Sequence, residues 1–348
     1  MAVQLKTTGS SSKQSTTRWR GILLSTILVA LLFVGLYSQP LFFDEDGLDQ
    51  KPISKKLHTN QAVFDPSHGR DRPLILYAYA ESDNARENLE FFVKRGLHAR
   101  ADFIFIFNGE TDAVGMIPTN LENVKIVQRE NTCYDIGAFG QVLAKDGLWM
   151  KYKRFITLNA SIRGPFLPVW SDECWTDAFL NKLSDTVKLV GLSYHCVPSP
   201  HVQSMLLATD RVGMKILLDP TYAYSVPLDT PPWGGAELPV GYSVCYSDYA
   251  QAVHAEIGMA RLIRSQGFEV DVMLTSVHAY TPKEYCEVLG PQSDHLGAGN
   301  YFGSNVHPYE LIFAKANRGI DDALLDHLTE WHYTMNDTSW DKCGRDRP

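Results

Sequence analysis

The chain has 348 residues, of which 45 % are hydrophobic and 21 % are charged, as is usual for a globular protein. This length exceeds one minimal domain and fits a membrane anchor, a stem and one large α/β domain. The net charge of -8 argues against nucleic acid as the partner, because nucleic-acid-binding proteins carry clustered positive charge. The expected partners are neutral or small charged molecules.

The first 43 residues have the pattern of a membrane anchor. Residues 1–20 contain lysine and arginine but no acidic residue, and residues 21–43 contain no charge at all. A helix of that length spans roughly 34 Å, enough for a bilayer core. Acidic residues follow from Asp44, so the positive-inside rule predicts a cytoplasmic tail at 1–20 and a transmembrane signal anchor at 21–43.

This arrangement predicts a single-pass type II protein of the Golgi or endoplasmic reticulum membrane, held in the lipid bilayer through residues 21–43. A cleaved signal peptide is the alternative, but its apolar core would normally be only about 7–15 residues long. Residues 44–72 lack an apolar period and are expected to form a flexible stem. Residues 73–348 are then the lumenal domain.

Six cysteines occur, all after residue 132: Cys133, Cys174, Cys196, Cys245, Cys286 and Cys343. No Cys-x-x-Cys pair is present, which disfavours a zinc ribbon or a thioredoxin-type site. In a lumenal compartment these cysteines can form up to three disulfides, and buried free thiols are the alternative.

The lumenal part alternates between strand-like and helix-like segments. Strands are expected at 73–79, 102–108, 123–128, 154–159, 187–193 and 268–274, with a further candidate at 204–209. Helices are expected at 84–96, 136–145, 175–183, 211–218 and 249–266. Short links between these segments predict an α/β fold with one mainly parallel central sheet and helices on both faces. The stretch 220–244 is expected to be an ordered loop over the active face.

Several common enzyme classes are disfavoured by missing motifs. The chain contains no Gly-x-Gly-x-x-Gly, Walker loop, Gly-x-Ser-x-Gly or His-Glu-x-x-His. Dehydrogenases, phosphate-loop enzymes, serine hydrolases of the α/β type and zincins are therefore poor candidates.

Four polar clusters carry a resemblance to a known family. They are Asn131 with Tyr134-Asp-Ile-Gly-Ala-Phe139, Leu158-Asn-Ala-Ser161 with Gly164-Pro165, His201-Val-Gln-Ser204, and Glu256-Ile-Gly258 followed by Gly267-Phe268. With these motifs the chain resembles the rhamnan-synthesis-F-like glycosyltransferases and their eukaryotic type II membrane relatives. The resemblance implies a Rossmann-like GT-A-type domain, a nucleotide-sugar donor, and a glycan or glycoprotein acceptor. Most GT-A enzymes carry Asp-x-Asp after a central strand, whereas Asn159-Ala-Ser161 stands there in this chain. Dependence on Mn²⁺ or Mg²⁺ is left open.

We expect the donor-binding residues to follow the ends of predicted strands, where ligands of α/β proteins bind. The candidates are Tyr79, Asn131, Tyr134, Asp135, Gly137, Asn159, Ser161, Arg163, His201 and Gln203. Arg163 is a candidate for bidentate phosphate binding, and a structural ion pair is its alternative. Asp135 is either part of the pocket or a helix N-cap. His201 is either a ligand residue or a structural histidine.

Inverting glycosyl transfer needs a carboxylate base to accept the proton of the acceptor hydroxyl. Glu256 is the leading candidate, because a carboxylate among apolar residues of a helix is either paired or functional, and Asp135 is the second. Lys315 is a weaker candidate for the donor phosphates, and an amphipathic surface helix over 308–315 is the preferred interpretation there. Of the two Asn-x-Ser/Thr sequons considered, Asn336 is the expected glycosylation site, because a glycan on Asn159 would block the pocket.

The predicted function is a glycosyltransferase of the secretory pathway that transfers a hexose or deoxyhexose. The alternative is a catalytically inactive carbohydrate-binding or scaffold protein on the same fold. A lumenal hydrolase is a third, weaker option, because no nucleophile motif is visible.

Overall fold

The computed structural model describes residues 69–289 and 294–344. The predicted tail, the anchor at 21–43 and nearly all of the stem lie outside these residues. No helix within the described part is long and apolar enough to cross a membrane. Arg70 and Arg72 both form ion pairs with Asp102 of the sheet, at 3.1 and 3.2 Å. These contacts tie Arg70 and Arg72, two residues of the predicted stem, to the sheet.

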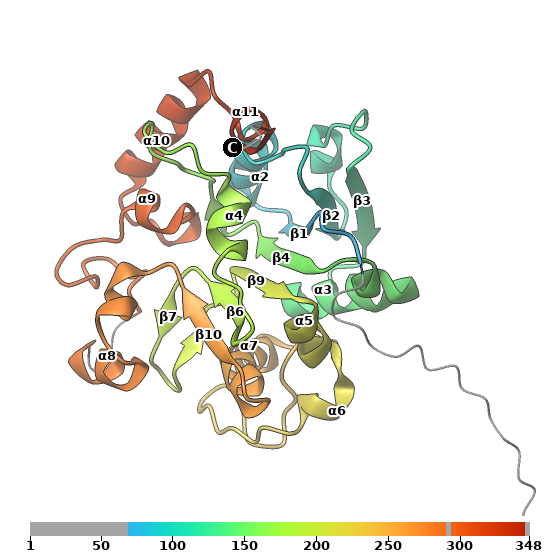
Figure 1. Cartoon of the computed structure of the whole chain (residues 1–348), viewed down its shortest axis with the longest axis vertical. Coiled ribbons are helices and arrows are strands. Elements are labelled where there is room, and N and C mark those ends of the chain that lie inside the picture. The colour runs from blue at the N-terminus through green and yellow to red at the C-terminus, as the bar shows by residue number, and fades with distance from the viewer. Residues whose placement is uncertain (1–68, 290–293, 345–348) are drawn as a thin grey trace, which may run out of the picture. The chain divides into compact units, whose positions relative to one another are not determined.

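A seven-stranded sheet forms the centre of the domain, with the strand order β10-β6-β9-β4-β1-β2-β3 (Figure 1). Its strands are β1 (Leu74–Ala80), β2 (Asp102–Asn108), β3 (Val124–Arg129), β4 (Arg154–Asn159), β6 (Val187–Gly191), β9 (Leu206–Asp210) and β10 (Glu269–Val272). All neighbours pair in parallel except β9, which runs antiparallel to both β4 and β6. The predicted α/β class and mainly parallel sheet are confirmed.

Two small two-stranded sheets lie beside the central one. Strand β5 (Ile162–Arg163) pairs with β11 (Ala314–Lys315), and β7 (Tyr194–His195) pairs with β8 (His201–Val202), both antiparallel. The first pairing brings the C-terminal quarter of the chain back to the end of β4. This contact positions the site described below.

The larger helices are α2 (Asp83–Arg95), α3 (Tyr134–Ala144), α5 (Arg211–Leu218), α7 (Tyr249–Ser265) and α10 (Asp322–Thr334). Shorter helices are α4 (Trp175–Leu180), α6 (Pro220–Ala223), α8 (Pro282–Leu289), α9 (Pro308–Leu311) and α11 (Ser339–Gly344), and the 3₁₀ helices are η1 (Asp112–Met116), η2 (Lys145–Lys151), η3 (Thr275–Ala279) and η4 (Ala316–Arg318). The predicted helices all occur, although α4 is shorter than expected. The predicted loop at 220–244 begins with the short helix α6.

Helices cover both faces of the sheet, as predicted. Successive residues of a strand point to opposite faces. On one face Tyr77 of β1 packs against Phe92 of α2, with ring centroids 4.9 Å apart. On the other face the hydroxyl of Thr157 lies 2.8 Å from that of Tyr242, whose ring contacts Phe139 of α3.

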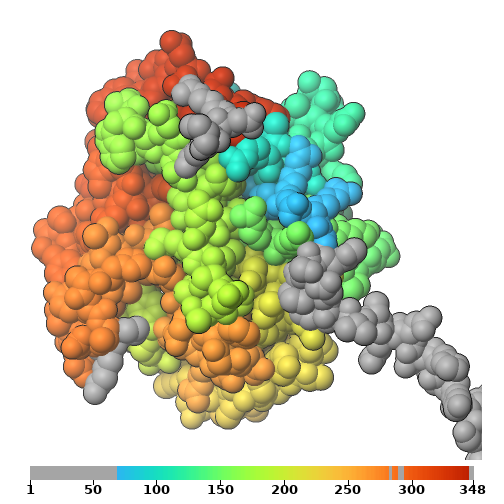
Figure 2. All heavy atoms as spheres, in the orientation of Figure 1, coloured from blue at the N-terminus to red at the C-terminus, as the bar shows by residue number. Residues whose placement is uncertain are grey.

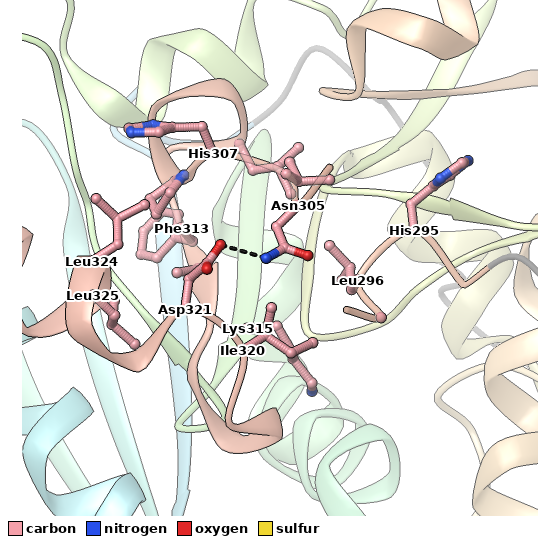
Figure 3. Close-up of a pocket in the computed structure, with 15 residues that line it drawn as sticks. His295, Leu296, Asn305, His307, Phe313, Lys315, Ile320, Asp321, Leu324 and Leu325 are labelled. Carbon is pink, nitrogen blue, oxygen red and sulfur yellow. Dashed lines mark hydrogen bonds between the residues drawn. The ribbon is translucent and has the colours of Figure 1, made fainter. Parts of the chain in front are cut away.

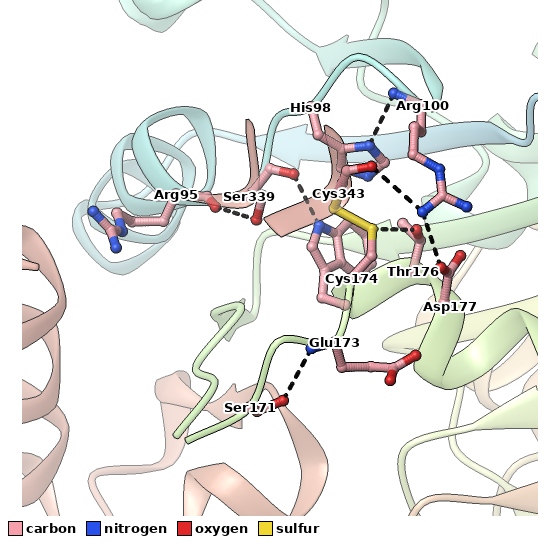
Figure 4. The surroundings of a disulfide bond; sticks show 12 residues. Arg95, His98, Arg100, Ser171, Glu173, Cys174, Thr176, Asp177, Ser339 and Cys343 are labelled. Carbon is pink, nitrogen blue, oxygen red and sulfur yellow. Dashed lines mark hydrogen bonds and ion pairs between the residues drawn. A yellow bond between two sulfur atoms is a disulfide. The ribbon is translucent and has the colours of Figure 1, made fainter. Parts of the chain in front are cut away.

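All six cysteines are paired, so the prediction of up to three disulfides is confirmed. The pairs are Cys133–Cys245, Cys174–Cys343 and Cys196–Cys286. Figure 4 shows Cys174–Cys343, which ties α11 to the start of α4. The Ser339 hydroxyl donates to the carbonyl oxygen of Arg95 nearby. In the space-filling view the red C-terminal residues lie beside the cyan residues near α2 (Figure 2), in agreement with this contact.

Candidate functional site

A cavity of about 330 Å³ opens at the edge of the sheet where β4 ends. Five parts of the chain meet there: the start of α3, the end of β4 with the residues after it, the residues before β9, α7, and the segment 315–318. The lining residues are Tyr134, Asp135, Ile136, Asn159, Ser161, Gln203, Ser204, Met205, Tyr249, Ala252, Val253, Glu256, Lys315, Asn317 and Arg318. This is the edge at which α/β proteins bind ligands.

Two further hollows adjoin this cavity. One of about 180 Å³ shares Asp135, Asn159 and Ser161 with it, and another of about 520 Å³ shares Tyr134. The three hollows share lining residues and are therefore neighbours along the sheet edge. Ligand sites in proteins commonly enclose about 300–1,000 Å³, so the hollows of about 330 and 520 Å³ are each of this size.

Asp135 is positioned by an unusual turn before α3. Cys133 and Tyr134 have positive φ angles of 69° and 52°, a left-handed conformation that is costly for residues other than glycine. The disulfide to Cys245 holds Cys133 in this turn. Asp135 then lies in the first helical turn, and its Oδ2 accepts a hydrogen bond of 2.7 Å from Nδ2 of Asn159. The N-cap position belongs to Cys133, so the N-cap alternative for Asp135 is wrong.

Burial raises the pKa of Asp135, the charge of Glu256 raises it further, and the hydrogen bond from Asn159 and the charge of Lys315 oppose this shift. A raised pKa in the folded state favours the protonated form. The contribution of Asp135 to the free energy of unfolding is therefore fully present below the ordinary aspartate pKa of about 3.9. It is lost as the pH rises through the raised pKa of the folded state. At neutral pH Asp135 therefore makes the fold less stable than it would be if this carboxyl kept its ordinary pKa.

We expect the Asp135→Asn variant to have a higher free energy of unfolding than the wild type at pH 7. The asparagine stays neutral, and its Oδ1 can still accept from Asn159. The difference should shrink as the pH falls towards about 3.9, the ordinary aspartate pKa, where the carboxyl becomes protonated in the unfolded chain as well. Urea unfolding at both pH values measures this. A variant that is less stable at pH 7 would show that Asn159 and Lys315 stabilise the charge more than burial penalises it.

A chain of hydrogen bonds follows β4 into the cavity. Oδ1 of Asn159 accepts from the backbone N–H of Ser161 at 3.1 Å and from the hydroxyl of Ser161. Nζ of Lys315 donates to the same hydroxyl oxygen at 2.7 Å. Lys315 reaches this point because β11 pairs with β5, which places Lys315 opposite Ile162. The amphipathic helix preferred for 308–315 is wrong: α9 ends at Leu311, and Lys315 faces the cavity.

Glu256 enters the cavity from α7. Its Oε2 accepts from both the backbone N–H of Ser204, at 3.3 Å, and the hydroxyl of Ser204. Its Oε1 lies 3.8 Å from Nε2 of His201, and 26 % of the side chain is exposed. One carboxylate oxygen is thus held in place, and the other is left to face His201 and the cavity.

The tautomer of His201 follows from its second contact. Nδ1 of His201 lies 2.7 Å from the carbonyl oxygen of Ser199. A carbonyl oxygen can only accept, so Nδ1 carries a hydrogen. In the neutral ring Nε2 is then the basic nitrogen, and it is the atom directed at Glu256. His201 is 2 % exposed, so it supports Glu256 from behind and does not line the cavity itself.

Besides His201, three further predicted donor residues do not line the cavity. Tyr79 lies on the α2 face of β1, is fully buried, and donates to Glu81 at 2.9 Å. Gly137 serves helix packing, because a Cβ there would lie 2.8 Å from the carbonyl oxygen of Val244. Arg163 is buried and donates to Asn88, Glu87 and Thr329, so the structural alternative to phosphate binding holds. These three assignments are corrected.

The other predicted residues lie at the site. Tyr134, Asp135, Asn159, Ser161, Gln203 and Glu256 line the main cavity, and exposed Asn131 lines the adjoining hollow of about 520 Å³. Oε1 of Gln203 accepts from the hydroxyl of Ser193 at 2.6 Å, which fixes its orientation.

Sequence reasoning missed Ser204, Tyr249 and Arg318, which line the cavity, and it ranked Lys315, which also lines it, as only a weaker candidate. A signal for Tyr249 was present, because Tyr249, Ala252 and Glu256 stand at i, i+3 and i+7 of one helix and share a face. Tyr249 and Tyr134 are 62 % and 42 % exposed, and their ring centroids lie 6.4 Å apart. Trp233 from the loop after α6 packs edge-on against Tyr249 at 5.7 Å. Together these aromatic side chains form one rim of the cavity.

A separate pocket of about 50 Å³ lies between the segments 295–308 and 311–325 (Figure 3). Nδ2 of Asn305 donates to Oδ2 of Asp321 across it at 2.6 Å. Most of its other lining residues are apolar, and it is too small for a sugar nucleotide. Lys315 lines this pocket as well as the main cavity.

Comparisons with known proteins give limited information. No protein-family model matches the chain, and no curated protein matches it. Among solved structures, a mannosyltransferase from Pyrobaculum calidifontis in complex with GDP-Man and Mn²⁺ is similar over 60 % of this chain and 56 % of its own, with 14 % identity and a TM-score of 0.38.

Two further structures are more distant. A cytidylyltransferase from Leptospira borgpetersenii has 9 % identity and a TM-score of 0.33, over 58 % of this chain and 76 % of its own. The glycosyltransferase GlyE from Streptococcus pneumoniae has 8 % identity and a TM-score of 0.27, over 40 % and 34 %. All three are named as transferases. Because every TM-score is below 0.5, these similarities do not establish the fold family or the activity, and the function has to be argued from the site.

Proposed function

We propose that this protein is a glycosyltransferase that moves a sugar from a nucleotide-sugar donor to a hydroxyl group of a glycan or glycoprotein. The observation that carries this proposal is that one cavity combines a positioned carboxylate, Glu256, with an ammonium group, Lys315. Direct displacement at an anomeric carbon needs both: a base for the incoming hydroxyl and a positive charge near the departing diphosphate.

The chemistry balances with these groups. The acceptor oxygen forms a bond to the anomeric carbon while the bond from that carbon to the diphosphate oxygen breaks. The acceptor proton passes to Oε1 of Glu256, since Oε2 is held by Ser204. Nε2 of His201, 3.8 Å from Oε1, is the next basic atom. The nucleoside diphosphate leaves with the bonding electron pair.

The aromatic rim supports a ligand that carries flat or apolar surfaces. Tyr134 and Tyr249 are exposed beside the cavity, whereas most large aromatic side chains of this domain are buried in its core. Exposed rings of this kind can stack on a nucleobase or on the apolar face of a sugar. We assign the donor to the stretch from Tyr134 to Ser161, and the acceptor to the Glu256 side.

The proposal also includes the location of the protein in the cell. A type II anchor at 21–43 would place the domain in the lumen of the Golgi or endoplasmic reticulum, where three disulfides are chemically reasonable. Asn336 is exposed between α10 and α11 and is the proposed N-glycan site. Asn159 is unsuited to this modification, because its Nδ2 donates to Asp135 inside the site.

Binding of the reaction product tests the proposal. The full-length chain in detergent is titrated calorimetrically with UDP, GDP, CDP and TDP, and we expect one of them to bind with a stoichiometry of one. A Tyr249→Ala variant should weaken this binding, because the exposed tyrosine contributes little to the folded core. Absence of binding for all four, with and without Mn²⁺, would contradict the proposal.

A further inference from the structure

The residues after β4 do not fit a divalent cation. The GT-A resemblance implies Mn²⁺ or Mg²⁺, which prefer carboxylate and other oxygen ligands. Here Oδ1 of Asn159 already accepts two hydrogen bonds from Ser161, and Nδ2 donates to Asp135. Asp135 is the carboxylate nearest this turn, and one of its oxygens is occupied by Asn159.

The described part of the chain shows no other cluster of three or more metal-ligating side chains near the cavity. Across residues 69–289 and 294–344, the group with metal-ligand spacing is His98, Cys174 and Cys343. Cys174 and Cys343 are joined in a disulfide, which removes their thiolates as ligands (Figure 4). The described residues therefore place no ready-made cluster of three or more metal-ligating side chains at the cavity.

Lys315 supplies a positive charge at this position instead. Its ammonium group has three N–H donors, and one of them is used by the hydroxyl of Ser161 at 2.7 Å. Ser161 is itself fixed by Asn159, so the ammonium is held at a defined point of the cavity wall. Burial lowers the pKa of Lys315 below its ordinary value, and the charge of Arg318 acts in the same direction, while the charges of Glu256 and Asp135 oppose this shift.

The other two cations nearby are committed elsewhere. Arg163 is buried and turned towards Glu87. Arg318 lines the cavity, but its Nη1 donates to Asp294 and to the carbonyl oxygen of Leu296. Lys315 is thus the cation best placed to offer hydrogen bonds to an incoming anion.

We propose that the ammonium of Lys315, oriented by Ser161, binds the diphosphate of the donor directly, and that donor binding requires no divalent cation. This inference rests on the proposed glycosyltransferase function and adds the chemical basis of its diphosphate recognition. Lys315 acts here as a binding residue, because it would touch the donor itself.

Calorimetry of the full-length chain tests this inference, with the four nucleoside diphosphates in EDTA and in Mn²⁺. We expect equal affinity under both conditions. Lys315→Met should weaken binding about 10- to 100-fold, the usual loss for a hydrogen bond to a charged group. Lys315→Arg retains the charge and should keep most of the affinity. Lys182→Met, which removes a lysine that pairs with Asp271, is the matched control and should bind like the wild type.

The outcomes separate this inference from the function on which it rests. Binding that appears only with Mn²⁺ would overturn the inference and leave the proposed function standing. Undiminished binding by folded Lys315→Met would also overturn it, and thermal unfolding checks that this variant is folded. Absence of binding under both conditions would contradict the glycosyltransferase proposal and the inference together.

Discussion

Replacing Glu256 by glutamine is expected to lower the rate of sugar transfer by about 10²- to 10⁴-fold, the usual contribution of a general base. Glutamine keeps the size of the side chain, and its Oε1 can still accept from Ser204. It cannot accept a proton from the acceptor hydroxyl. Donor affinity should change by less than about threefold, because the lost function concerns the transition state and not donor binding.

The measurement is the steady-state rate of nucleoside diphosphate release with wild type and Glu256→Gln. Glu269→Gln provides a matched control, since Glu269 is an exposed residue paired with Arg264 at 3.6 Å. A Glu256→Gln variant with wild-type turnover would exclude Glu256 as the base. Asp135 would then be the next candidate, because it lines the same cavity.

This variant also separates an enzyme from an inactive carbohydrate-binding protein. An enzyme should lose transfer and keep donor binding. A carbohydrate-binding protein should show no donor turnover in the wild type, and its glycan binding should survive the substitution. His201→Gln gives a further comparison: loss of the basic nitrogen near Glu256 should reduce turnover less than loss of the carboxylate itself.

The second large effect concerns the disulfide beside the site. We expect the double variant Cys133→Ser/Cys245→Ser to lose about 2–5 kcal/mol of unfolding free energy, because the bond closes a long loop. The sequence separation of its two cysteines is 112 residues. Without this bond the left-handed turn at Cys133 and Tyr134 can relax, which would move Tyr134 and Asp135. Displacement of site residues by about 1 Å can cost 100-fold, so we expect donor affinity to fall by about 10- to 100-fold.

A second disulfide provides the control for this experiment. Cys174 and Cys343 are 169 residues apart, so Cys174→Ser/Cys343→Ser should lose a similar amount of stability. Its cysteines lie at α4 and α11 and do not line the cavity. Urea unfolding of both double variants measures the loss of stability, and calorimetric titration measures the loss of donor affinity. Equal loss of donor affinity in the two variants would show that the Cys133–Cys245 bond acts through general stability alone.

Much of the fold could be predicted because buried parallel strands are continuous apolar runs. The strand 102–108 was predicted with the bounds of β2, and 154–159 with those of β4. The antiparallel direction of β9 could not be predicted, since local sequence encodes a strand but not its partner. The segment 192–205 between β6 and β9 contains the β7–β8 hairpin, which returns the chain without a crossover helix.

The sequence placed candidate residues at the cavity where they lie close to the end of a strand, as at Asp135 and Asn159. The prediction was wrong where the direction of the side chain decides whether a residue reaches the cavity. Tyr79 lies near the carboxyl end of β1, where ligands of α/β proteins bind. Successive side chains of β1 alternate between the two faces of the sheet, however, and Tyr79 lies on the face opposite the cavity. The sequence could give Lys315 only as a weaker candidate, because its position depends on a two-residue strand pairing with residues more than 150 positions earlier. Such long-range pairing leaves no local pattern.

The central claim is that this chain uses a nucleotide-sugar donor, and donor turnover is its most direct test. The full-length protein is incubated with a panel of UDP-, GDP-, CDP- and TDP-sugars, and the released nucleoside diphosphate is measured with wild type and Glu256→Gln. We predict release from at least one donor by the wild type, in EDTA as well as in Mn²⁺, and strongly reduced release by the variant. Absence of release from every donor, with a folded protein and a mixed glycan acceptor present, would contradict the account.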